Sequence, residues 1–255
     1  MTQLIDTFLQ PAWRVSGRVR AVVTTRRGGN SISPYDSLNL ATHVGDAPDA
    51  VKKNRRLLKQ ALNLPSEPLW LEQVHGNVVV DSQCATECKA DASYADGPGI
   101  VCVVMTADCL PVFLADAQGK EVSVVHAGWK GLLQGVIEAA LKKFKAPPEN
   151  IHAWLGPAIG PKNFEVGAEV RKAFLDEAHP GEVPANAFQP VDIEKNKFLA
   201  DIYQLAGLRL NRIGVKNISG GDFCTVENKE MFYSYRRDGV TGRMASLIWI
   251  AEDKK

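Results

Sequence analysis

The chain has 255 residues, of which 45% are hydrophobic and 23% are charged, a composition typical of a folded globular protein rather than a disordered, collagen-like or membrane-embedded one. A formal net charge of +1 creates no overall field that attracts polyanions, so nucleic-acid binding is not expected. Five cysteines, an odd number in a mid-sized chain, favour a reducing compartment over a disulfide framework.

The N-terminal segment MTQLIDTFLQPAWR has no basic stretch followed by an apolar one, and no apolar run approaches the length of a membrane span. We therefore expect a cytoplasmic protein that does not interact with membranes. Since no linker or repeat divides the sequence, residues 1–255 are predicted to form a single catalytic domain, and the low net charge permits a monomer.

Segments rich in valine and isoleucine alternate along the chain with segments of helical periodicity. The ADAQGK segment, residues 115–120, predicts a hairpin and hence antiparallel pairing within a sheet. Residues 179–190 are predicted to form a surface loop. The overall pattern favours a mixed α/β or α+β fold. The predicted strands are 17–25, 77–81, 99–106, 121–126, 151–155, 215–219 and 244–250, and the predicted helices are 48–62, 131–145, 166–178 and 199–213.

Two residues of metal-binding or nucleophilic type lie at the ends of predicted strands. Cys109 follows strand 99–106 and precedes Pro111, whose missing N–H predicts a turn or bulge there. His126 ends strand 121–126, and His75 in LEQVHGN follows another short apolar run. These three side chains are too far apart in sequence for a local metal-binding motif, so the pattern alone leaves open whether they form a site or are ordinary core residues.

The remaining cysteines give weaker signals. Cys84 and Cys88 have C-x₃-C spacing without a second Cys/His pair, which favours a surface segment over a zinc finger. Cys102 alternates with apolar neighbours and is predicted to lie in the core, and Cys224 is left without a role.

Cationic side chains next to glycines suggest an anion site. Arg26 precedes Gly28–Gly29, Arg237 lies in the YRRDGVTGR segment, and Lys130 follows Gly128 at the start of helix 131–145. Guanidinium groups on such loops and a glycine-rich helix start suit phosphate or carboxylate, although a solvated surface loop gives the same pattern. P-loop, dinucleotide-binding, G-x-S-x-G and H-E-x-x-H motifs are absent from the sequence.

Taken together, six segments resemble the laccase-domain family, whose members are described as multifunctional purine nucleoside phosphorylases, earlier as polyphenol oxidases, and in some bacteria as a peptidoglycan editing factor. The motifs occur in order and span nearly the whole chain. They are TTRRGGNSISPYDSLNLATHVGD (24–46), WLEQVHGNVV (70–79), TADCLPV (106–112), VVHAGWKGL (124–132), LGPAIGPKNFEVG (155–167) and FYSYRRDGVTGRMASLIWI (232–250).

The resemblance implies a fold similar to that of cytotoxic-necrotizing-factor-type cysteine enzymes, in which helices enclose a pair of packed β-sheets. It also implies that His75, Cys109 and His126 form a zinc site. Three protein ligands with an open fourth position are typical of a catalytic zinc.

The implied activity is phosphorolysis of purine nucleosides such as adenosine, inosine and methylthioadenosine, with adenosine deamination also credited to the family. We expect Lys130, Arg26 or Arg237 to position phosphate. Cys109 and His126 are predicted to act at the metal, and Asp108 or Glu72 is a candidate general acid.

Three alternatives remain at this level. A cysteine hydrolase or amidase that edits muramoyl precursors of peptidoglycan would use Cys109 as nucleophile and His126 as base. A copper-dependent polyphenol oxidase has less support, because multi-copper sites need many histidines and the chain has five. A non-enzymatic binding protein is the third alternative.

Overall fold

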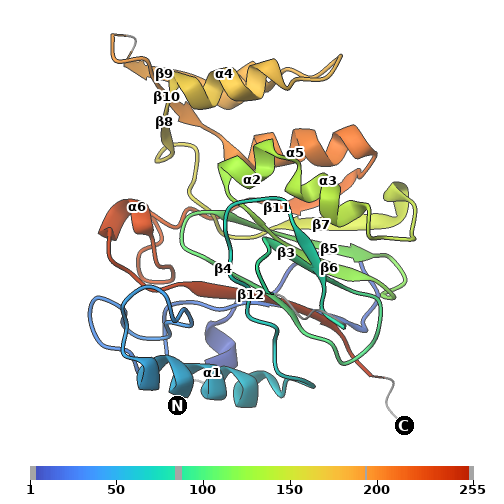
Figure 1. The fold of residues 1–255 in the computed structure, drawn as a ribbon, viewed down its shortest axis with the longest axis vertical. Helices are drawn as coiled ribbons and strands as arrows, with labels where there is room; N and C mark the ends of the chain where they lie inside the picture. Colours follow the sequence, from blue (N-terminus) through green and yellow to red (C-terminus); the bar gives the residue numbers. More distant parts are fainter. Residues whose placement is uncertain (1–3, 84–87, 193, 253–255) are drawn as a thin grey trace.

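The computed structural model describes residues 4–83, 88–192 and 194–252. Its elements form a stack of layers in which helices enclose two sheets (Figure 1). The layered arrangement of helices around packed sheets confirms the predicted α+β class.

The smaller of the two packed sheets has the strand order β1-β12-β4, with antiparallel pairing throughout. Its strands are β1 (Val19–Val23), β12 (Met244–Ile250) and β4 (Cys102–Thr106). Helix α1 (Pro48–Leu62) covers the outer face, where its buried Leu58 belongs to the same apolar cluster as Val22 and Leu247.

The larger sheet has six strands in the order β11-β7-β5-β6-β3-β2 and is mixed, since only its two outermost pairs are parallel. The β5–β6 hairpin lies at its centre and confirms the antiparallel pairing predicted from residues 115–120. The strands are β11 (Asn217–Gly220), β7 (Ile151–Leu155), β5 (Leu110–Asp116), β6 (Val122–Ala127), β3 (Ala92–Ala95) and β2 (Val79–Asp81).

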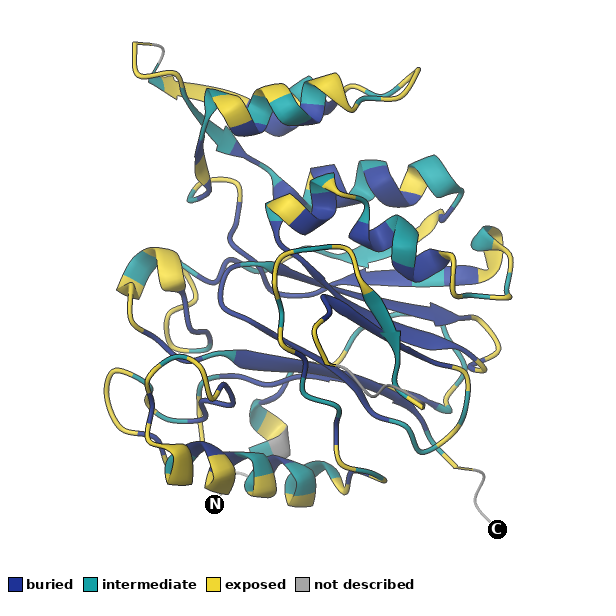
Figure 2. Cartoon of the chain, viewed as in Figure 1, coloured by how far each residue is buried: buried dark blue, intermediate teal, exposed yellow. Residues whose placement is uncertain are grey.

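Apolar side chains fill the space on both faces of the larger sheet. Phe113 and Trp154 contact each other edge to face between the two sheets, in a cluster that also contains Val104 and Ile248. The other face packs against α2 (Trp129–Leu133), α3 (Val136–Leu141) and α5 (Ile202–Ile213). Because both faces are covered, the central strands are buried along their whole length (Figure 2).

A small outer layer lies beyond α5 (Figure 1). It consists of a three-stranded antiparallel sheet in the order β8-β10-β9 and the helix α4. Its elements are β8 (Glu165–Gly167), α4 (Ala168–Asp176), β9 (Phe188–Asp192) and β10 (Lys197–Ala200). The remaining short elements are α6 (Tyr235–Asp238) and the 3-10 helices Leu4–Thr7, Pro148–Asn150 and Pro184–Ala187.

Two local predictions are corrected by the structure. The helix expected over 131–145 is divided into α2 and α3 because Gly135 adopts a φ of +82°, a left-handed conformation that ends α2. The apolar stripe continues across the break, so the periodicity did not reveal it. The segment 179–190 is only partly a surface loop, since Ala187 and Phe188 are buried at the start of β9.

None of the helices in the described part of the chain is long and apolar enough to cross a membrane.

Candidate metal centre and cleft

The fold brings His75, Cys109 and His126 together. Their ligand atoms all lie within 4.8 Å of one another, and they form the group with metal-binding potential found among the described residues. Cys109 directly precedes β5 and His126 lies near the end of β6, while Pro111 pairs with His126 in the β5–β6 register. The two side chains therefore share one edge of the larger sheet, as strand-end placement in the sequence suggested.

Cys109 is presented by a tight turn between β4 and β5. Asp108 has a φ of +87°, and its carboxylate accepts hydrogen bonds from the Thr225 hydroxyl and, at 2.7 Å, from the Arg236 backbone N–H. Both carboxylate oxygens are thus occupied in tying the turn to Thr225 and to α6. Asp108 therefore holds the turn in place, and its role in proton transfer stays a prediction.

Asp91, which the sequence analysis did not single out, organises the other two ligands. This fully buried carboxylate accepts a hydrogen bond from His126 Nδ1 at 2.8 Å and from the backbone N–H groups of His75 and Gly76 at 2.9 and 2.7 Å. Burial by itself would raise the pKa of Asp91, but the hydrogen bonds from His126 and Gly76 lower it. A carboxylate on Nδ1 leaves Nε2 of the imidazole free to bind a metal.

His75 lies on the loop before β2, in a left-handed conformation with a φ of +60°. Its Nε2 is 3.9 Å from Cys109 Sγ, and its ring meets that of His126 edge to face, with centroids 4.8 Å apart. A Cβ at Gly131 would lie 2.7 Å from the Gly76 carbonyl oxygen, so glycine in α2 is what lets this loop pack closely.

The electrostatics of the cluster favour a thiolate. Burial alone would raise the pKa of the Cys109 thiol, but His126 and His75 lower it to about 6. Burial would likewise lower the pKa of His126, but Cys109 and Asp91 raise it to about 9. The thiolate is the form of cysteine that binds metals and attacks electrophiles.

Glycine at position 128 leaves space beside the three ligands. A Cβ built on Gly128 would lie 3.1 Å from Cys109 Sγ, 3.1 Å from His75 Cδ2 and 3.7 Å from His126 Nε2. One thiolate and two imidazoles form a donor set suited to zinc, and also to copper. The residues present therefore fit a metal ion held by three protein ligands.

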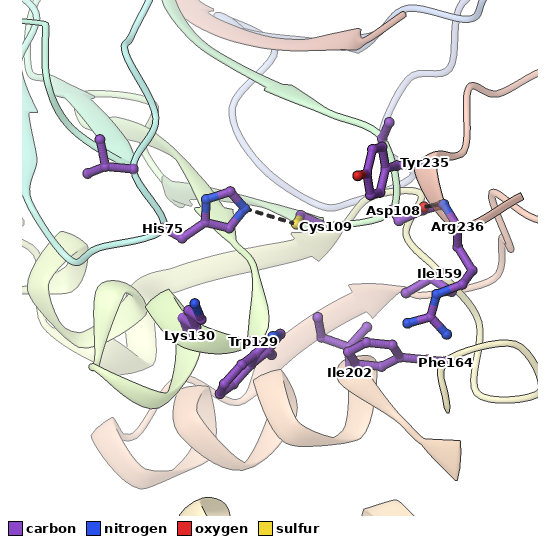
Figure 3. Close-up of a pocket in the computed structure, with 12 residues that line it drawn as sticks. His75, Asp108, Cys109, Trp129, Lys130, Ile159, Phe164, Ile202, Tyr235 and Arg236 are labelled. Atoms are coloured by element: carbon purple, nitrogen blue, oxygen red, sulfur yellow. Dashed lines mark hydrogen bonds between the residues drawn. The ribbon is translucent and has the colours of Figure 1, made fainter. Parts of the chain in front are cut away.

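The cluster opens into a cleft that we call the Trp129 pocket, with a volume of about 400 Å³, a size typical of small-molecule sites. Trp129, Ile202 and Phe164 line one side of it, opposite the His75–Cys109 pair (Figure 3). Its wall also includes Val74, Ala107, Asp108, Lys130, Ile159, Tyr235 and Arg236.

The structure separates the predicted cationic residues. Lys130 is exposed and lines the Trp129 pocket, with its Nζ 5.6 Å from the centroid of the Trp129 ring. Arg26 and Arg237 instead line a different pocket, together with Asp36 and Asp238. Each of these two arginines donates to backbone carbonyls and pairs with one of those carboxylates, so neither lies at the metal cluster.

The other candidates lie away from the cluster. Cys102 is fully buried in β4, as predicted, and burial raises its pKa to about 11. Cys224 is buried, and its Sγ accepts hydrogen bonds from Gly160 N and Asn163 Nδ2. Cys88 is an exposed free thiol, and Cys84 lies outside the described residues. Glu72 is exposed and lines neither pocket at the cluster.

Residues 20–251 match the model of the family described as multi-copper polyphenol oxidoreductase laccase. The chain belongs to this family. Purine nucleoside phosphorylase YfiH of Escherichia coli K12 is 53% identical over 248 residues, which cover 96% of this chain and 100% of the relative. A purine nucleoside phosphorylase of Pseudomonas aeruginosa is 48% identical over 248 residues, which cover 97% of this chain and 100% of the relative. The resemblance noted in the sequence is thereby confirmed.

Solved structures of the family share the fold. A Neisseria meningitidis protein superposes with a TM-score of 0.91 at 46% identity, covering 96% of this chain and 100% of that one. YlmD from Geobacillus stearothermophilus superposes with a TM-score of 0.86 at 28% identity, covering 96% and 99%.

Proposed function

We propose that this protein is a zinc-dependent purine nucleoside phosphorylase acting as a single catalytic domain. The observation that carries the proposal is the Cys-His₂ cluster at the end of a cleft with aromatic and apolar walls. The purine nucleoside phosphorylases of Escherichia coli and Pseudomonas aeruginosa, at 53% and 48% identity, support the same activity. The free thiols at Cys88, Cys102, Cys109 and Cys224 are in keeping with a cytoplasmic location.

The reaction exchanges the purine for phosphate at C1′ of the ribose. The C1′–N9 bond breaks and its electron pair leaves with the base, while a phosphate oxygen forms a new bond to C1′. The proton of hydrogenphosphate is transferred to the departing base, so the products are the free purine and ribose 1-phosphate. Such a reaction needs a bound anion, a site for a flat heterocycle and stabilisation of developing charge.

The Trp129 pocket offers the walls that a purine requires. Trp129 and Phe164 present aromatic surface, and Ile202 and Ile159 extend the apolar wall (Figure 3). Packing of these side chains on the base would exclude water and orient C1′ toward the metal cluster.

At the other end of the pocket, His75, Cys109 and His126 would hold the zinc, and Asp91 fixes the His126 imidazole through Nδ1. A bound zinc supplies a Lewis acid that stabilises negative charge on substrate oxygens. The same chemistry applied to water would serve the deamination of adenosine.

The test removes the thiolate. Cys109→Ala should abolish zinc retention and nucleoside phosphorolysis while leaving a folded protein, because the side chain lies at the cleft and not in the core. Base release from inosine with and without phosphate is followed by chromatography, and zinc is quantified in the same samples. Cys88→Ala, which removes an exposed thiol, is the matched control. Full phosphorolysis by Cys109→Ala would refute the proposal.

One observation favours a second candidate. Cysteine hydrolases use a nucleophilic thiolate, a base and a carboxylate that orients the base, and here Cys109, His126 and Asp91 occupy these three positions. A hydrolase or amidase acting on muramoyl precursors would use the thiolate directly and would be active without metal. Hydrolysis by metal-free protein, lost after alkylation of Cys109 with iodoacetamide, would support this candidate over the phosphorylase.

A copper polyphenol oxidase has less support. The described residues contain one cluster of metal-binding side chains with two histidines, whereas multi-copper electron transfer needs several such sites.

A further inference from the structure

A second pocket lies beside the metal cluster and has no role in the function proposed above. This pocket, here called the Arg243 pocket, has a volume of about 380 Å³. It shares His75, Ala107, Cys109 and Tyr235 with the Trp129 pocket, so the two cavities meet at the cluster. Its own wall includes His43, Thr106 and Arg243.

Arg243 carries a positive charge into this pocket without an acidic partner. Its Nη1 donates to the carbonyl oxygens of Thr241 and Gly242 at 2.9 Å each. Neither Nε nor Nη2 donates to a protein acceptor in the described part of the chain, and no carboxylate there lies within 4.0 Å of this guanidinium; Cys109 and Asp108 attract it only from beyond that distance. A half-buried arginine with two free N–H edges is a ready partner for an oxyanion.

This arginine differs from its neighbours in the same loop. Arg236 donates from both terminal nitrogens to the carbonyls of Asn163 and Glu165, and Arg237 is held by three carbonyls and Asp238. All three guanidinium nitrogens of Arg237 have protein acceptors, and both terminal nitrogens of Arg236 do, whereas Arg243 has an acceptor for only one of its three.

A buried hydroxyl beside Arg243 also lacks a partner. Thr106 is 2% exposed, lines the Arg243 pocket, and its Oγ1 has no hydrogen-bond partner among the described residues. A buried hydroxyl without a partner is costly unless a ligand or water satisfies it. In the β12–β4 pairing Thr106 lies opposite Met244, the residue after Arg243, and both Thr106 and Arg243 line this pocket.

Hydrogen bonds hold the backbone next to Thr106 and at Arg243. The Gln73 amide makes two hydrogen bonds to the backbone of Met105, which precedes Thr106, and the Arg243 N–H donates to Asn39 Oδ1. His43 adds an imidazole whose pKa is lowered by burial, by Arg243 and by Arg55. A neutral imidazole can donate one hydrogen bond to an anion without competing for charge.

We propose that the Arg243 pocket is the phosphate subsite of the enzyme, with Arg243 and Thr106 donating to the phosphate oxygens, while the nucleoside occupies the Trp129 pocket. The proposal rests on the proposed function. It places the attacking oxygen and the leaving purine in cavities that meet at the metal cluster, on different sides of C1′, as displacement requires. In this proposal Arg243 takes the phosphate-binding role that the sequence pattern suggested for Lys130, Arg26 or Arg237.

The test separates the two substrates kinetically. In Arg243→Gln the KM for phosphate should rise by roughly tenfold or more, the loss expected for a charge-assisted hydrogen bond, while the KM for inosine stays within about twofold. Thr106→Val replaces the unpartnered hydroxyl with a methyl group and should raise the phosphate KM severalfold without destabilising the fold. Arg56→Gln, which removes an exposed charge on α1, is the matched control. Zinc content is measured for each variant.

Direct binding keeps this test independent of turnover. Equilibrium dialysis of labelled inorganic phosphate against zinc-loaded protein should show that the wild type binds phosphate and that Arg243→Gln and Thr106→Val bind it more weakly. Chloride at equal ionic strength should not displace phosphate from the wild type. If wild-type protein binds phosphate in this way but releases no base, the proposed function fails and the anion subsite stands. The inference is overturned if Lys130→Ala raises the phosphate KM and neither Arg243→Gln nor Thr106→Val does. It is also overturned if the wild type and all variants bind phosphate equally well.

Discussion

Replacing Gly128 by alanine tests the metal site without changing any of its ligands. The added Cβ would be 3.1 Å from Cys109 Sγ and His75 Cδ2 and 3.7 Å from His126 Nε2. A zinc ion lies about 2.0–2.3 Å from its nitrogen and sulfur ligands, so a methyl carbon this close to all three side chains should crowd an ion bound by them. We expect zinc affinity to fall by about 100-fold or more, which corresponds to about 2.7 kcal/mol.

The same substitution should leave the metal-free protein folded. Gly128 has φ −64° and ψ 156°, a conformation that alanine adopts freely. Reduced entropy of the unfolded chain should stabilise the variant by about 0.4–1 kcal/mol, against a cost of about 1–3 kcal/mol for the crowded contacts. The net destabilisation of about 0–2.5 kcal/mol is well below the 5–15 kcal/mol typical of a folded domain.

Zinc affinity is measured by competition with a chromophoric chelator, and stability by urea unfolding in the presence of EDTA. Gly207→Ala is the control, because a Cβ there on α5 meets nothing within 4 Å and should leave zinc binding unchanged. Zinc affinity of folded Gly128→Ala within about threefold of the wild type, a difference of only about 0.7 kcal/mol, would refute the placement of the metal.

The remaining predictions concern two carboxylates. Asp91→Asn should weaken zinc binding by about 10- to 100-fold, because the His126 imidazole loses its charged partner; unchanged affinity in the chelator assay would contradict this. Arg212 lowers the pKa of Glu182 to about 2 from an ordinary value of 4.5, so the pair stabilises the fold above about pH 4.5 and this contribution is lost as the pH falls toward 2. Glu182→Gln should remove that part of the pH dependence in urea unfolding, and identical pH profiles for the two proteins would rule it out.

Local sequence patterns were sufficient for most of the strands and for one part of the site. Short runs rich in valine and isoleucine, bounded by turn residues, predicted β4, β6, β7 and β12, because strands buried in a sheet consist of a few consecutive apolar residues. The hairpin at residues 115–120 and the strand-end positions of Cys109 and His126 placed these two side chains at one edge of a sheet.

Short elements of weak periodicity were less predictable. Strands β3, β8, β9 and β10 have three to five residues each, too few for a period of two to stand out. The break at Gly135 was hidden because the apolar stripe runs on through α3, whose residues face the same side of the large sheet as those of α2.

The sequence by itself determined the family, the kind of fold and the three candidate metal ligands. Only the tertiary structure decided which charged groups lie next to these ligands. Asp91 reaches His126 because β3 pairs with β6, and Arg243 and Thr106 line one pocket because β12 pairs with β4. Arg237, with a similar sequence context, is bound instead by carbonyls of its own neighbourhood. Residue type and spacing describe neighbours along the chain, whereas the partners of a buried charge are set by pairings between strands that are distant in sequence.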